Sequence, residues 1–183
     1  IEDKGTALTV RFDLDEPAPV GGLKVYVDSE VEQIINRLDL SGFAASPTVE
    51  NVDPSSFVTN FDNSGIALTI EEGATFGTFT INVFDNPEPD TFLPEPFDGL
   101  VEAALSLRTQ DEVDPADQND ITEVGDYTID PEGASSTIIF ADEARQLTDM
   151  PPTEPPTEPP TEPPMSDALQ VSLFTGPDYL IED

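Results

Sequence analysis

Apolar residues at every second position recur along most of this sequence, and this pattern most restricts how the chain can fold. In residues 77–90, Phe79, Ile81 and Val83 alternate with polar residues. A period of two with β-branched and aromatic side chains predicts a strand that buries one face. Turn-forming residues bound further segments of this kind at 6–14, 23–28, 66–70, 100–108, 127–129 and 135–141, with shorter extended pieces at 48–51 and 57–60. Roughly seven or eight short strands predict an all-β, antiparallel Greek-key β-sandwich.

One stretch departs from the period of two. The apolar positions of residues 31–38 follow i, i+3, i+4, i+7 spacing, which predicts one short inserted helix. Ser29 with Glu32 three residues later matches a capping box, and Gly42 predicts where the helix stops.

The charge balance excludes several classes of partner. The 183 residues include 39 acidic and 6 basic side chains, a formal net charge of −33. Such a surface repels nucleic acid and anionic lipid and attracts cations. No apolar run approaches the length of a membrane-spanning helix, so we expect no membrane span.

The residue types that the chain lacks restrict its chemistry. The sequence contains no Cys and no His, so disulfides, thiolate metal sites, a Cys nucleophile and a His general base are excluded. An enzyme would have to work with paired carboxylates. We therefore expect no enzymatic activity. The absence of Cys is compatible with an extracellular protein.

Oxygen ligands begin where two of the predicted strands end. The strand at 77–83 runs into an acidic turn stiffened by Pro87 and Pro89, and the strand at 135–141 runs into a second acidic pair. Carboxylate and amide oxygens held at the end of a rigid strand suit a hard cation such as Ca²⁺. The alternative is a solvated acidic loop. The candidate ligands in these two places are Asp85, Asn86, Glu88, Asp90, Asp142 and Glu143.

A proline repeat separates the predicted sandwich from the last residues. Residues 151–164 are three copies of Pro-Pro-Thr-Glu and a final Pro-Pro. This composition predicts a polyproline II rod of about 43 Å. The regular acidic spacing favours a spacer over a ligand for SH3-type domains. The predicted organisation is a sandwich at 1–146, a linker at 147–166 and a strand at 167–183.

The two ends of the sequence share a tripeptide. Ile-Glu-Asp begins the chain at residue 1 and ends it at residue 183. Joined head to tail, these ends would read as a strand, a turn and a second strand, which predicts a tandem array with a period of about 180 residues. We expect residues 167–183 to complete the sandwich of the next repeat by strand addition. The expected partners are therefore neighbouring copies of the same repeat, joined head to tail.

The order of these segments resembles a Calx-beta domain. The resemblance is carried by GTALTV, by GIALTIEEGATFGTFTINVFDN with its acidic turn, by VEAALSLR and by the closing STIIFADE, and it covers most of residues 1–143. It implies a seven-stranded β-sandwich in which some members bind Ca²⁺ at acidic loops gathered at one end. By position, the resemblance implies the ligands Glu2, Asp3, Asp85, Asn86, Glu88, Asp90, Asp142 and Glu143. Asn86 stands where a second Asp is usual, and the inserted helix replaces a short acidic segment of which Asp28 remains, so one weak ion is expected at most.

These observations lead to a ranked expectation of function. The first is a non-catalytic structural repeat of a secreted or cell-surface protein, an adhesin stalk or extracellular filament, stabilised by Ca²⁺. The second is a passive acidic spacer of halophilic type without a specific metal site. The third is a hydrolase built on paired carboxylates.

Overall fold

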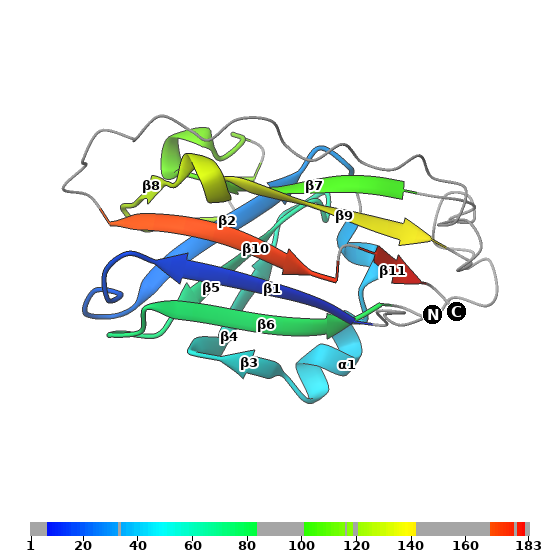
Figure 1. Ribbon diagram of the computed structural model, residues 1–183, viewed down its shortest axis with the longest axis horizontal. Helices are drawn as coiled ribbons and strands as arrows, with labels where there is room; N and C mark the ends of the chain where they lie inside the picture. Colours follow the sequence, from blue (N-terminus) through cyan, green and yellow to red (C-terminus); the bar gives the residue numbers. More distant parts are fainter. Residues whose placement is uncertain are drawn as a thin grey trace.

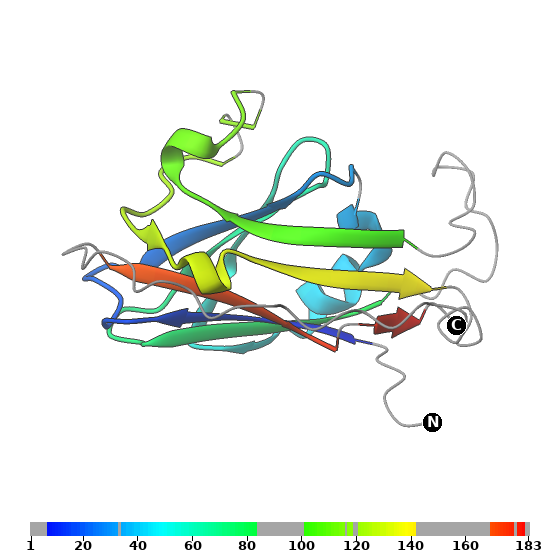
Figure 2. The ribbon, with the colours of Figure 1, turned by 45° about the horizontal axis from the view of Figure 1, so that its top comes forward.

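The computed structural model describes residues 7–32, 34–83, 101–115, 117–118, 121–141, 169–177 and 179–181, which form two packed β-sheets (Figures 1 and 2). The prediction of an all-β sandwich is confirmed. No helix among these residues is long and apolar enough to cross a membrane.

The first sheet has the strand order β3-β6-β1-β10-β8. Its central pairs, β6 with β1 and β1 with β10, are antiparallel. Its two edge strands are short, which limits the unpaired backbone that the sheet exposes. The bounds are β3 Thr48–Glu50, β6 Phe76–Asn82, β1 Ala7–Leu14, β10 Gln170–Gly176 and β8 Thr128–Ile129.

The second sheet has the strand order β11-β9-β7-β2-β5-β4. The β4 edge is interrupted by a register shift between Asp53 and Val58, beside Pro54. A bulge and a proline at an edge discourage pairing with other chains. The bounds are β11 Tyr179–Ile181, β9 Ser135–Ala141, β7 Val101–Arg108, β2 Leu23–Ser29, β5 Ile66–Ile70 and β4 Val52–Thr59.

The core lies between the two sheets and follows from the period of two. Along β1, Leu8, Val10, Phe12 and Leu14 are buried, while the alternate positions are partly or fully exposed. Because successive side chains in a strand point to opposite faces, one face of β1 contacts the second sheet. Phe79 on β6 completes an aromatic contact with Phe12 at 6.3 Å between ring centroids.

The prediction of one helix over residues 31–38 is wrong. The chain forms a 3₁₀ turn η1 (Ile34–Arg37) and then the α-helix α1 (Leu40–Ala45). Asp39 caps α1, because its Oδ1 accepts a hydrogen bond of 2.8 Å from the Gly42 amide. Leu38 is instead held in a β-bridge to Val83, which ends the 3₁₀ turn. The apolar spacing therefore indicated which of these residues are buried, but it did not indicate a continuous α-helix.

The structure adds detail to the predicted antiparallel sandwich in its strand count and in two of its pairings. The described residues contain eleven strands, not seven or eight, because the short extended pieces expected at 48–51 and 57–60 correspond to strands β3 and β4, and the last residues add β10 and β11. Two pairings are parallel, β10 with β8 and β11 with β9. Parallel neighbours need a crossover of a dozen or more residues, and the connection from 142 to 168 supplies that length.

The prediction that residues 167–183 lie apart from their own sandwich is wrong for the part that the structure describes. β10 pairs with β1 of the same chain, from Thr9↔Gly176 to Leu14↔Val171. β11 then pairs with β9 in the other sheet. Val171 and Leu173 are buried on the core side of β10, so this strand adds to the apolar face that β1 turns toward the second sheet. We call β10 and β11 together the closing segment.

Candidate functional site

All the predicted calcium ligands fall outside the described residues. They are Glu2, Asp3, Asp85, Asn86, Glu88, Asp90, Asp142 and Glu143. The structure therefore leaves the ligand assignment as a prediction.

The described strands that adjoin these residues meet at one end of the sandwich, which we call the strand-end pole. β1 begins there at Ala7, directly opposite Asn82 at the end of β6. β9 ends there at Ala141, and Phe140 lies opposite Val101, the first residue of β7. Figure 1 shows these strand ends together at the right of the molecule. The segments that carry the predicted ligands are thus attached at the same pole.

Asp28, which the Calx-beta resemblance implies as a remaining acidic residue, lies away from the strand-end pole. It follows Tyr26 and Val27 on β2, where Val27 faces the core and its neighbours face outward. The Ser64 hydroxyl donates to Asp28 Oδ1 at 3.0 Å, and Arg108 Nε lies 3.9 Å from Asp28 Oδ2. Asp28 therefore belongs to a separate polar cluster.

This cluster is centred on Asn60, in the turn between β4 and β5. The Asn60 side chain is 2% exposed, and its Nδ2 lies 2.7 Å from Ser64 Oγ, 3.1 Å from Tyr26 Oη and 3.3 Å from Asp117 Oδ2. Its Oδ1 accepts from the Gly65 amide at 2.9 Å. We call the group the Asn60 cluster, and its members are Tyr26, Asp28, Asn60, Asp62, Ser64 and Asp117.

Burial and charge oppose ionisation within the Asn60 cluster. Burial raises the pKa of Asp117, the hydrogen bond from Asn60 lowers it, and the carboxylates of Asp62 and Asp28 raise it again. Burial also raises the pKa of Tyr26, with a further contribution from Asp28 and Asp117. The phenol therefore stays protonated at neutral pH, and the negative charges repel one another.

The residues that follow β7 are held against the outer face of the second sheet by the contact between Asn60 and Asp117 and by hydrogen bonds to Lys24 on β2. The Gly125 amide donates to the Lys24 carbonyl at 2.8 Å, and Lys24 Nζ donates to the Thr122 carbonyl at 2.6 Å. A Cβ at Gly125 would lie 2.6 Å from Leu23 Cδ1 and 3.0 Å from the Lys24 carbonyl oxygen, so any other residue here would require Leu23 to move. Ile121 is fully buried beneath the same segment.

The Asn60 cluster is a structural clasp, by which we mean a set of hydrogen bonds that holds a loop in place. Within the described ranges, every buried side-chain nitrogen and oxygen has a hydrogen-bond partner. No three His, Cys, Asp or Glu side chains of the described chain are grouped to hold a metal ion. Asp117, the most buried of the three carboxylates, is 6% exposed and already accepts from Asn60. A clasp of this kind fixes a loop and leaves little room for a substrate.

Sequence reasoning missed this cluster. Asn60 and Asp117 are 57 residues apart, and no local pattern joins them. The one available signal was the run of turn-forming residues from 60 to 65, which predicts side-chain hydrogen bonds to nearby amides. That signal does not identify Asp117.

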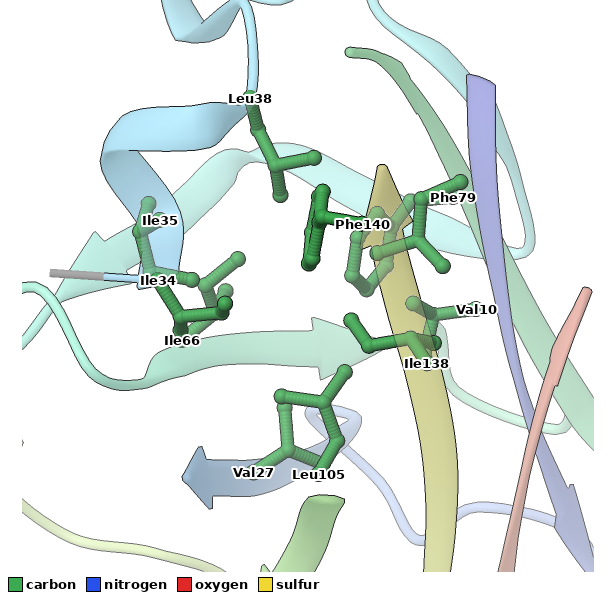
Figure 3. A pocket seen from close by; sticks show the side chains of 11 residues that line it. Val10, Val27, Ile34, Ile35, Leu38, Ile66, Phe79, Leu105, Ile138 and Phe140 are labelled. Carbon is green, nitrogen blue, oxygen red and sulfur yellow. The ribbon is translucent and has the colours of Figure 1, made fainter. Parts of the chain in front are cut away.

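A void between the sheets is too small and too apolar for a ligand. Figure 3 shows side chains from both sheets around it, with Ile34 and Ile35 from η1 on one side and Phe79 and Phe140 on the other. Its volume is about 10 Å³. An apolar cavity of one water's size or less stays dry, so this void is a packing defect of the core.

A larger groove lies between α1 and the edge strand β4. Its volume is about 310 Å³. Phe43 and Phe57 form its aromatic wall, with ring centroids 4.8 Å apart, and Pro47 and Pro54 flank it. No charged side chain lines it. Thr59 is the one hydroxyl-bearing residue among the lining residues, so the groove suits an apolar group and offers no charged group to a reacting molecule.

Comparison with known proteins gives no match: no protein-family model, no curated protein and no solved structure matches this chain. The Calx-beta resemblance therefore stays a prediction that rests on the residues quoted for it.

Proposed function

We propose that this chain is a non-catalytic structural repeat of a secreted or cell-surface protein, a stalk or filament unit stabilised by Ca²⁺ and joined head to tail to its neighbours. The observation that carries the proposal is the strand-end pole. There β1 begins at Ala7, β6 ends at Asn82 and β9 ends at Ala141, beside the three acidic segments of the sequence.

The charge of the chain supports a role for cations. With a net charge of −33, the folded state repels itself, and any bound cation relieves that repulsion. Ca²⁺ prefers several carboxylate and carbonyl oxygens in a flexible shell, which acidic segments at a common pole can supply. An extracellular-type site would have a dissociation constant of about 10⁻⁴ to 10⁻³ M.

A passive acidic spacer is the second candidate. It is favoured by the net charge of −33, which is larger than one binding loop accounts for. Its carboxylates would hold water and counter-ions without binding a particular ion, and the chain would respond to sodium as it does to calcium at matched ionic strength.

Thermal unfolding distinguishes these candidates. We expect Ca²⁺ to raise the melting temperature well above the effect of NaCl at equal ionic strength. At a hundredfold excess over the dissociation constant, one site adds about 2.7 kcal/mol to the free energy of unfolding. An equal shift with sodium would show screening and refute a specific site.

A matched pair of variants tests the ligand assignment. Asp85→Ala removes a carboxylate that follows a core strand, while Glu154→Ala removes one from the proline repeat. Calorimetric titration should show weaker calcium binding for Asp85→Ala and unchanged binding for Glu154→Ala. Identical titrations for the two variants would contradict the assignment.

A further inference from the structure

The closing segment completes both sheets after the chain has already passed through all the other strands. We propose that this segment, β10 with β11, is exchanged between copies of this chain, so that each copy inserts it beside β1 and β9 of the next. The inference rests on the proposed structural role and names the partner, a second copy, and the surface, the slot between β1 and β9.

The closing segment pairs with strands that precede the connection 142–168, β10 on both of its sides and β11 with β9. β10 lies between β1 and β8, with register pairs from Thr9↔Gly176 to Leu14↔Val171 on the β1 side. On the other side, the Asp130 amide donates to the Val171 carbonyl at 2.9 Å. The Ser172 hydroxyl also donates to Asp130 Oδ2 at 2.8 Å. Another copy offers the same set of bonds.

Burial makes an empty slot unfavourable. Val171 and Leu180 are fully buried, and Leu173 is 2% exposed. Removing them would expose the apolar side chains on β1 and β9 and an unpaired strand edge, which invites pairing with any matching strand. The slot is therefore filled either by the chain's own segment or by that of a neighbour.

The connection is long enough for either arrangement. The closing segment runs from Gln170, next to Asp15, back to the strand-end pole, where Ile181 pairs with Ala141. That path of eleven residue steps spans roughly 36 Å, and residues 142–168 must bridge a similar distance to close the same sandwich. Fully extended, these residues reach about 90 Å. The excess allows Gln170 to reach the slot of an adjacent copy.

The closing segment makes the same contacts in its own chain as in another copy. The protein concentration and the charge repulsion between copies therefore decide which of the two arrangements forms. Each copy carries a net charge of −33, which opposes close approach at low salt. Salt shortens the range of that repulsion to about 10 Å at 0.1 M and less above it. Exchange should therefore increase with protein concentration and with salt. Because each copy donates its segment to one neighbour and accepts from another, repeated exchange gives an open, head-to-tail assembly.

Cysteine cross-linking in the full chain tests the exchange, because the native sequence contains no Cys. Arg11 on β1 and Phe174 on β10 are register partners on the exposed face of the first sheet. Directly opposed residues of an antiparallel pair lie within the Cα distance that a disulfide needs. A mixture of Arg11→Cys chains with Phe174→Cys chains can form that disulfide only between two copies.

The control mixture pairs Phe174→Cys with Val20→Cys, which places a more accessible thiol than position 11 (Val20 is 89% exposed, the Arg11 side chain 45%) on the turn after β1. After incubation at high protein concentration and high salt, non-reducing gels should show about tenfold more cross-linked dimer for the Arg11→Cys mixture, because strand pairing holds the thiols at millimolar effective concentration.

The double variant Arg11→Cys/Phe174→Cys checks the register, since it forms the disulfide within a closed monomer. Dimer in the mixture at the control level, while the double variant oxidises, would overturn the exchange. A double variant that fails to oxidise would show that residues 11 and 174 are not register partners, and this would overturn the proposal. No metal enters this readout, so its result is independent of the calcium titrations that test the proposed function.

Discussion

Leu173→Ala tests whether the closing segment is an integral part of this sandwich. Leu173 faces the core from β10 and is 2% exposed. Its neighbour Phe174 points to the other face and is 49% exposed. The two residues are adjacent in the sequence, so any local effect on the strand is shared, and only their burial differs.

The expected magnitudes differ widely. Truncating a buried leucine to alanine costs about 2–5 kcal/mol, since both apolar transfer and the remaining cavity contribute. Phe174→Ala removes a half-exposed ring and should cost less than about 1 kcal/mol. For a chain of this size, a loss of 3 kcal/mol lowers the melting temperature by roughly 6–12 °C.

Urea unfolding followed by far-UV circular dichroism gives both free energies. The midpoint should fall strongly for Leu173→Ala and little for Phe174→Ala, with similar m-values because both variants unfold the same domain. Equal losses for the two variants, or no loss for Leu173→Ala, would show that β10 does not pack into this core in the register seen here.

Two further predictions concern the Asn60 cluster. Because the folded-state pKa of Asp117 is raised above its ordinary value of 3.8, its ionisation disfavours the fold at neutral pH, and that penalty disappears as the pH falls through the folded-state pKa. Asp117→Asn should therefore raise the free energy of unfolding at pH 7 by up to about 1 kcal/mol, with a smaller gain at acidic pH. The exposed control Asp126→Asn should give no gain. A gain for Asp117→Asn that does not change with pH would contradict this reasoning. Asn60→Ala should lower the free energy of unfolding by about 2–3 kcal/mol, because it leaves the buried Gly65 amide without its acceptor. Amide hydrogen exchange should become faster at Gly65 and Gly125 in this variant, and unchanged protection there would argue against a clasp.

The sequence by itself determined the layer architecture and the buried face of most strands. The alternation in residues 6–14, 66–70 and 135–141 identified three strands that the structure contains almost to the residue. This works because the side chains of a strand alternate between faces wherever that strand pairs. The placement of acidic residues after strand ends was also readable locally, although their ligand role stays a prediction.

Only the tertiary structure decided which strands are neighbours. Nothing in residues 170–176 indicates that they insert between β1 and β8 of the same chain, and the proline repeat before them suggested the opposite. The apolar spacing of residues 31–38 resembled a helix because η1 and Leu38 are buried in an irregular path. The Asn60 cluster joins residues from three separate parts of the chain. Local sequence sets the preferred backbone conformation and the apolar face of each strand. Strand pairing depends instead on which arrangement fills the whole core and satisfies its buried polar groups. The free energy that selects this arrangement comes from contacts between residues far apart in the chain.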